Sequence, residues 1–373
     1  MKKPHPKKRL SRYRPEKNAF PDLIIRDRDR LILHLVYEHR FLSGELIWHL
    51  LEVAGEAHRT EYTTGEDGKK RPSQYGFGQQ ALSKRLKQLF NARFLDRHYI
   101  IDQPLGRGSG TPRAIYGLGP KSAKLLAEQT GVPAQEIRDI VEANKVKSPF
   151  LRHALEVATF RVILELACRR SQGRVRLIFW EQGQCLRDHI IGRNEKGEDE
   201  RFTIYPDAFF ALEVEGIGKA NYFLEVDRGT MPIIAAGRRT DIRKKILGYR
   251  HFRNFIRENQ RYYYRTTPDG QVVGLHVVDR ESKSLMPQDS GFESIRGFTV
   301  LFLVPGSLES SKKVKGRIAN ILSAFPLFGK AFATSSLFWF APFDAFQIDS
   351  PQSVFRRAWM IANPRKGLQS LIE

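Results

Sequence analysis

Apolar residues recur at helical spacing three times within the first hundred positions of the chain. The spacing predicts helices over residues 28–38, from Ser43 onward, and over residues 79–92. Ser43 can cap the second helix, because its hydroxyl oxygen accepts a hydrogen bond from a free backbone amide of the first turn. The apolar stripes are Ile32, Leu35 and Val36; Leu46, Ile47, Leu50 and Leu51; and Leu82, Leu86, Leu89 and Phe90.

A pair of strands is predicted after the third helix. Residues 94–101 are predicted to form one strand, the glycines of 106–110 a turn, and residues 113–118 the second strand. Residues 52–78, between the second and third helices, are polar and contain glycine, so we expect a long loop there.

Three helices and a strand pair resemble a winged helix-turn-helix domain. In that fold the third helix enters the major groove of DNA, and here its outer side is basic with no acid between. The DNA contacts that the resemblance implies are Lys84, Arg85 and Lys87, Arg93 just beyond them, and Arg107 and Arg113 on the wing. A small helical domain with a solvated basic face, or a winged helix that binds protein, explains the same pattern.

The second half of the chain alternates between helical and strand patterns. One linker helix is predicted over 121–144, followed by a domain boundary at 145–149. Residues 265–296 are expected to form a second long loop. The later elements are a helix at 150–170, strands at 174–180, 202–215 and 221–227, a helix at 241–258, a strand at 298–304, a helix at 310–323 and a strand at 336–341. This order predicts an α/β core with a mixed sheet.

Acidic residues stand inside two of the predicted strands. Asp207 shares a strand face with Tyr205 and Phe209, and Glu225 shares one with Asp227. Carboxylates among apolar residues are costly unless something pairs with them. Two like charges ~4 Å apart repel by about 4 kcal/mol at an effective dielectric near 20. If Asp207 and Glu225 converge, a divalent cation relieves this repulsion, and hard oxygen ligands suit Mg²⁺ or Mn²⁺.

The helix predicted at 241–258 can complete the site. At 100° per residue, Lys245 lies on the same side as Ile242 and Ile246, whereas Lys244 points away. Lys245 can therefore reach the acids, with Tyr249 one turn further along.

The spacing of these acids resembles a known class of nuclease. Pro206-Asp207, then seventeen residues, then Glu225-Val226-Asp227, on successive strands after a long helix, resembles the PD-(D/E)XK restriction-endonuclease-like fold. Asp227 stands where that motif ends in lysine, and Lys245 is the candidate for a lysine that has moved to the following helix. With the winged helix, the string from Glu225 to Thr230 is similar to the replication-relaxation family of mobile elements and to MobC-type plasmid relaxases.

The resemblance implies roles for individual residues. Asp207 and Glu225 would bind the metal ion, with the Val226 carbonyl as a third ligand. Asp227 would be a further ligand or an orienting acid, and Lys245 would stabilise the charged phosphate or help activate water. As an alternative, the acids form ordinary ion pairs with Arg228, Arg238 or Arg239 in a nuclease-like fold without activity.

Two other patterns suggest possible functional residues. Tyr262-Tyr263-Tyr264 suggests a tyrosine nucleophile, but covalent relaxases also need a histidine cluster, and the ten histidines here are scattered, so a strand is expected. Residues 310–317 form a basic helix start, which predicts a solvated face or, alternatively, a phosphate contact.

Charge and composition narrow the class of partner. The formal net charge is +21, and residues 1–20 hold eight Lys/Arg against one Glu. The excess is spread along the chain, which favours a long polyanion over one small acidic ligand.

No run reaches the ~18 apolar residues of a membrane span, and residues 1–9 lack the apolar stretch of a secretory signal. Two cysteines, Cys168 and Cys185, make no disulfide framework, so we expect the reducing cytosol.

Together these patterns predict an α/β protein of several domains. The expected order is a basic disordered arm (1–20), a winged helix-turn-helix (21–120), a linker helix (121–148), a PD-(D/E)XK nuclease-like domain (149–345) and a C-terminal tail (346–373).

The expected function is that of a protein that binds double-stranded DNA of a plasmid or integrative element. It would nick or relax this DNA at an origin by metal-dependent hydrolysis, alongside mobilisation or replication proteins. A DNA-binding replication factor on an inactive nuclease fold is the alternative, and an interaction protein that uses its long loops is a third.

Overall fold

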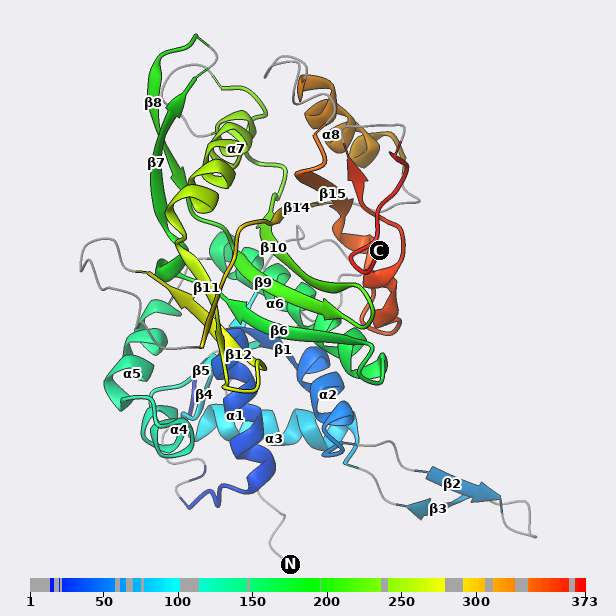
Figure 1. Cartoon of the computed structure of the whole chain (residues 1–373). Coiled ribbons are helices and arrows are strands. Elements are labelled where there is room, and N and C mark those ends of the chain that lie inside the picture. Colours follow the sequence, from blue (N-terminus) through cyan, green and yellow to red (C-terminus); the bar gives the residue numbers. More distant parts are fainter. Residues whose placement is uncertain are drawn as a thin grey trace, which may run out of the picture. The chain divides into compact units, whose positions relative to one another are not determined.

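The chain folds into two compact units, residues 1–162 and 163–373, in a computed structural model (Figure 1). The residues described are 14–16, 20, 22–57, 61–64, 70–74, 77–100, 114–145, 148–194, 196–235, 241–278, 291–305, 311–325, 335–361 and 366–373. Most of the predicted basic arm lies outside these ranges. No described helix is long and apolar enough to cross a lipid bilayer.

The first unit holds the three predicted helices and the predicted strand pair. The helices are α1 (Asp27–His39), α2 (Gly44–Val53) and α3 (Gln79–Asn91). Strands β1 (Leu42–Ser43), β5 (Ala114–Leu118) and β4 (Leu95–Tyr99) form an antiparallel sheet in that order. Ser43 caps α2 as expected, since its hydroxyl accepts a hydrogen bond from the Leu46 amide at 3.2 Å.

Two sequence predictions for this unit are wrong. The expected loop at 52–78 contains a hairpin of β2 (Glu61–Thr64) and β3 (Lys70–Gln74), whose polar sequence gave no alternation to indicate strands. The single helix predicted over 121–144 is two, α4 (Ser122–Thr130) and α5 (Ala134–Ala143). Gly131 takes φ 74° at the end of α4, and Pro133 lacks the amide hydrogen that would continue the helix.

The second unit is built on a mixed sheet, as the sequence predicted, and this sheet has six strands. Helix α6 (Ser148–Arg170) precedes it, and the order across the sheet is β16-β15-β14-β10-β9-β6. Strand β14 is parallel to β10 and β15, and the other pairs are antiparallel. The strands are β6 (Val175–Glu181), β9 (Ala208–Val214), β10 (Gly218–Val226), β14 (Thr299–Val304), β15 (Phe338–Pro342) and β16 (Met360–Ile361).

The strand predicted over 202–215 is interrupted. Strand β8 (Asp199–Ile204) ends before Pro206, which has no amide hydrogen to give to a ladder, and β9 begins after Asp207. β8 pairs with a strand that was not predicted, β7 (Asp188–Arg193), to form a hairpin.

The expected long loop at 265–296 is also partly strand. Tyr262 to Tyr264 lie in β11 (Tyr262–Thr266), as expected, and β11 forms the centre of a second sheet. Its neighbours are β12 (Val272–Val277) and β13 (Phe292–Ser294).

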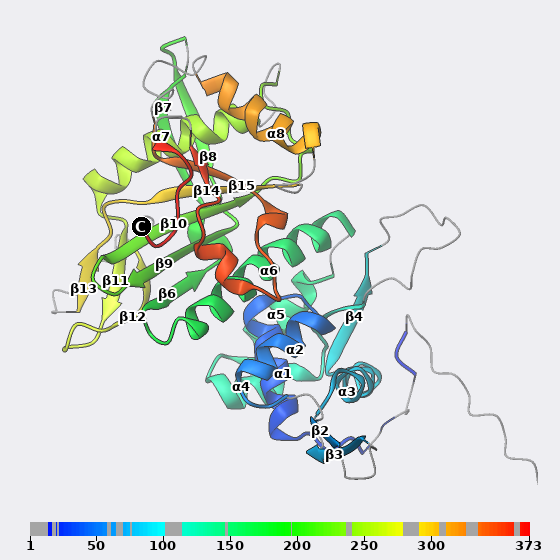
Figure 2. The same ribbon diagram turned by 90° about the vertical axis from the view of Figure 1, so that its right-hand side faces the viewer.

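Helices α7 (Ile242–Asn259) and α8 (Ser311–Ala324) pack on one face of the large sheet. Aromatic rings form much of this core, with Phe209 and Phe223 stacked at 4.2 Å between centroids. On the opposite face the hydroxyl of Tyr222 donates to the Leu371 carbonyl at 3.0 Å, so the C-terminal segment covers it (Figure 2). Short 3₁₀ turns are η1 (Gln184–Leu186), η4 (Phe343–Ala345) and η5 (Pro351–Phe355).

Candidate active site

Glu225 is a buried carboxylate on the face of β10 that carries α7. Only 2% of the residue is exposed. The amine of Lys245 forms an ion pair with Oε2, and the hydroxyl of Tyr249 donates to Oε1 at 2.7 Å. Lys245 and Tyr249 are four residues apart, so successive turns of α7 bring both to the same carboxylate. Both oxygens of Glu225 therefore have a partner.

Burial and the charges of this cluster together shift the pKa values of Glu225, Lys245 and Tyr249. Burial raises the pKa of Glu225 above its usual range, opposed by the positive charge of Lys245 and reinforced by the negative charge of Asp207. Burial alone would lower the pKa of Lys245, but the charges of Glu225 and Asp207 outweigh it and raise that pKa. Burial and Glu225 also raise the pKa of Tyr249, so its phenol stays a neutral donor.

Asp207 lies in the short connection between β8 and β9, not within a strand as expected. Its amide donates to the Leu224 carbonyl at 2.9 Å, and its Oδ2 accepts from the Val226 amide at 2.7 Å. These two bonds hold the side chain of Asp207 beside the end of β10. The structure thus brings Asp207, Glu225 and Val226 together, and Lys245 forms an ion pair with Glu225.

Asp227 has a different partner from those that the sequence suggested. Its Oδ2 accepts from Nε and Nη2 of Arg317 at 2.9 and 2.7 Å, and its Oδ1 accepts from the Gly229 amide at 3.0 Å. Arg238 and Arg239, two of the expected partners, lie outside the described residues. Arg317 lies ninety residues after Asp227 along the chain. The only sequence signal for this contact was that Arg317 belongs to the basic helix start at 310–317.

The oxygen donors of this cluster fit a hard divalent cation. Mg²⁺ is usually held by one or two carboxylates and keeps several waters, and Asp207, Glu225 and the Val226 carbonyl supply oxygens of this kind. Among the described residues no three His, Cys, Asp or Glu side chains group closely enough to hold a metal ion by themselves. A cation here would therefore depend on water and a bound phosphate for its remaining ligands.

The basic residues predicted on the third helix separate into two sets. Lys84 and Lys87 are exposed on α3. Arg85 turns inward, where its Nε donates to the buried carboxylate of Asp29 at 2.7 Å and its Nη2 to the Ile24 carbonyl at 2.6 Å. This ion pair ties α3 to α1, a role that the sequence pattern did not indicate.

Arg93, beyond the end of α3, is also exposed, and its backbone takes φ 68°. Arg107 and Arg113, predicted on the wing, lie outside the described residues.

Comparison with known proteins decides the family. Residues 33–267, more than half of the chain, match the replication-relaxation family. This chain belongs to the replication-relaxation family. Membership indicates a role in the replication or relaxation of a plasmid or similar element. No curated protein and no solved structure shows significant similarity to the chain.

The matched segment of this family member contains α3 and the cluster around Glu225. It ends before α8, so Arg317 joins the acids from outside the region that defines the family.

Proposed function

We propose that this protein binds double-stranded DNA at an origin of a plasmid or integrative element and nicks it there by metal-dependent hydrolysis. The observation that carries the proposal is the convergence of Asp207, Glu225 and Lys245 at one end of β10. Two acids and a lysine at the junction of neighbouring strands are the groups that the nuclease resemblance implies.

The order of elements also supports a nuclease-like domain. Helix α6 is followed by the antiparallel strands β6, β9 and β10, then by α7 and by β14, parallel to β10. This order of a helix, three strands, a helix and a further strand is the one that the sequence analysis predicted around the acids. In the first unit, α1 to α3 with the sheet of β1, β5 and β4 support a winged helix, with Lys84 and Lys87 facing outward to DNA.

The residues of the site have distinct roles in this mechanism. Asp207, Glu225 and the Val226 carbonyl would hold the cation, which when bound supplies an activated water and neutralises phosphate charge. Lys245, paired with Glu225, is placed to compensate the negative charge that develops on the phosphate oxygens. Tyr249 fixes the orientation of Glu225 through its hydrogen bond. Arg317 acts as a positioning residue, because its contact with the Asp227 carboxylate holds Asp227 away from the cation.

A specific observation favours a second function. Both oxygens of Glu225 already accept from Lys245 and Tyr249, and both oxygens of Asp227 have donors. Internal partners of this kind stabilise a carboxylate without any metal ion. They suit a DNA-binding replication factor that keeps the nuclease-like fold for its structure alone.

A nicking assay separates the two functions. The full chain is incubated with Mg²⁺ or Mn²⁺ and a supercoiled plasmid carrying the element's origin, and conversion to open circles is followed on a gel. Asp207→Asn keeps an acceptor for the Val226 amide but removes the charge, and we expect it to lose at least ~100-fold in rate. The exposed acid Asp344, changed to Asn, is the matched control and should keep full activity.

The result that overturns the nuclease function is equal nicking by wild type and Asp207→Asn. Specific DNA binding by the wild type with no cleavage under either cation would select the second function. Thermal unfolding of each variant verifies that the comparison is made between folded proteins.

A further inference from the structure

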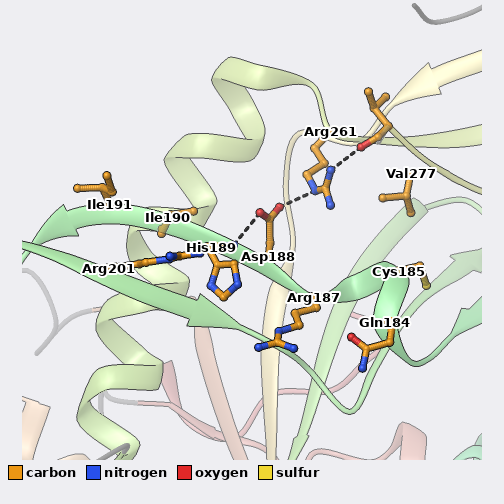
Figure 3. Close-up of a pocket in the computed structure, with 11 residues that line it drawn as sticks. Gln184, Cys185, Arg187, Asp188, His189, Ile190, Ile191, Arg201, Arg261 and Val277 are labelled. Atoms are coloured by element: carbon orange, nitrogen blue, oxygen red, sulfur yellow. Dashed lines mark hydrogen bonds and ion pairs between the residues drawn. The ribbon is translucent and has the colours of Figure 1, made fainter. Parts of the chain in front are cut away.

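A basic pocket lies at the base of the β7–β8 hairpin, outside the cluster around Glu225. It is a cavity of about 660 Å³ within the second unit (Figure 3). The hairpin, the turn at η1, the residue before β11 and the end of β12 form its walls. Three arginines from three elements line it. Arg187 follows η1, Arg201 lies in β8, and Arg261 immediately precedes β11.

One of these arginines is neutralised inside the protein. Asp188, the acid of the pocket wall, is buried, and its Oδ2 lies 2.5 Å from Nε of Arg261. Its Oδ1 accepts from the His189 amide at 2.8 Å, and Arg261 also donates to the Val278 carbonyl. Figure 3 shows this pair on one side of the β7 strand, with Arg187 and His189 on the other. The pair forms a fixed wall and leaves no net charge of its own.

The other two arginines supply uncompensated positive charge. Arg187 and Arg201 are exposed, and no acid in the described part of the chain pairs with either of them. They share the outward face of the hairpin with His189 and Ile191, because Ile191 pairs opposite Arg201 in the ladder and residues alternate in direction along each strand. Two unpaired guanidinium groups beside one cavity favour an anion with several oxygens, and guanidinium geometry matches phosphate.

The apolar part of the wall indicates more than a free phosphate. Ile191 is 75% exposed beside the arginines, and Val277 contributes a second apolar side chain. A nucleic-acid strand presents phosphates together with apolar sugar and base faces, so it satisfies both kinds of surface. The pocket also adjoins the candidate active site along the chain, since Asp188 pairs with Ile204, three residues before Asp207.

We propose that this pocket binds the phosphate backbone of a nucleic-acid strand through Arg187 and Arg201, at the edge that the fixed pair of Asp188 and Arg261 supports. The inference rests on the proposed function only in taking DNA as the partner, and it holds whether or not the protein cleaves DNA. It adds a contact surface in the second unit to the one expected on α3.

The first test measures the salt dependence of binding. The full-length double variant Arg187→Ala/Arg201→Ala is titrated against a labelled origin duplex by fluorescence anisotropy at several salt concentrations. Loss of two phosphate contacts should lower the slope of log affinity against log salt by about 2 and weaken binding by at least about tenfold at 0.1 M salt. The control is Arg169→Ala/Arg170→Ala, which removes the same charge from exposed positions at the end of α6.

The second test reads occupancy of the pocket directly. Cys185 lines the pocket and is exposed, whereas Cys168 is buried. Burial raises the pKa of both thiols, that of Cys168 to about 12. N-ethylmaleimide, which is uncharged, should therefore label Cys185 selectively. Saturating DNA should slow this labelling several-fold in the wild type and not in the double arginine variant.

The outcomes separate this inference from the proposed function. A wild type that binds no DNA contradicts the proposed function. A wild type that binds DNA, with an unchanged slope in the double arginine variant or with no protection of Cys185, overturns the inference alone. Protection by a mononucleotide but not by an oligonucleotide would likewise overturn it, because the pocket would then be a nucleotide site.

Discussion

Glu225 has a buried negative charge, and its neighbours determine whether that charge can persist. Removing a carboxylate from water is unfavourable unless hydrogen bonds and an opposite charge replace the lost hydration. Lys245 and Tyr249 provide both from α7. Asp207 adds a second negative charge nearby, which raises the pKa of Glu225 further. At the scale of single residues, the cluster brings the two acids Asp207 and Glu225 close to one lysine, and a metal ion would reduce the repulsion between the two acids.

The hydrogen bond from Tyr249 to Glu225 should contribute measurably to stability. Tyr249→Phe removes the hydroxyl from a residue that is 1% exposed and leaves Oε1 of Glu225 without that donor. Since hydrogen bonds to charged groups are worth about 1.5–3 kcal/mol, we expect a loss of that size in the free energy of unfolding, measured with urea. Tyr205→Phe is the matched control, because Tyr205 is 46% exposed, and it should change stability by less than about 0.5 kcal/mol. Equal effects from the two changes would contradict this account of Glu225.

The charged residues of α3 show what a sequence can and cannot reveal about single side chains. Helical periodicity correctly placed Leu82, Leu86 and Leu89 in the core. It gave no sign that Arg85 turns inward, because the carboxylate that holds it, Asp29, is fifty-six residues away on α1. The same limit applies to Arg317 and Asp227. Long-range ion pairs depend on tertiary contacts that no local pattern encodes.

At the scale of elements, the predictions were correct where the pattern was regular and wrong where a single residue interrupted it or where strands carried no clear alternation. Amphipathic stripes gave α1, α2, α3 and α7 nearly to their ends. The strand predicted over 202–215 is broken at Pro206, and the linker helix is broken at Gly131. The break at Pro206 has a structural consequence, because it leaves Asp207 in a short connection where its carboxylate accepts a hydrogen bond from the Val226 amide.

The connection after β5 depends on a close backbone approach at Gly119. A Cβ atom at this position would lie 2.5 Å from the Arg93 carbonyl oxygen and 2.9 Å from the Leu95 carbonyl carbon, both of them backbone. Gly119→Ala should therefore destabilise the first unit by about 1–3 kcal/mol, measured as a lower unfolding midpoint, since backbone atoms cannot move aside cheaply.

Gly44→Ala provides the matched control for Gly119. Gly44 opens α2, and a Cβ there would make an ordinary contact at 3.6 Å with the Leu86 side chain. Alanine also favours the helix, so stability should stay the same or rise. If Gly119→Ala proved as stable as Gly44→Ala, the packing described between the end of α3 and the end of β5 would be wrong.

At the scale of the whole molecule, positive charge and the family agree on the kind of partner. The net charge of +21 favours a polyanion as partner, and replication-relaxation membership indicates an association with DNA. The exposed lysines of α3 and the arginines of the hairpin pocket belong to different units. We expect both units to contribute to DNA binding, with Asp207 and Glu225 as the centre for chemistry.

The central claim is that Asp207 and Glu225 together hold a divalent cation. Its most direct test is a titration of Mn²⁺ into the full-length protein, followed by electron paramagnetic resonance of the free ion. We predict one Mn²⁺ site in the wild type that is lost in Asp207→Asn and in Glu225→Gln and kept in Asp344→Asn. Equal Mn²⁺ binding by the wild type and all three variants, or no bound Mn²⁺ in the wild type with origin DNA present, would contradict the claim.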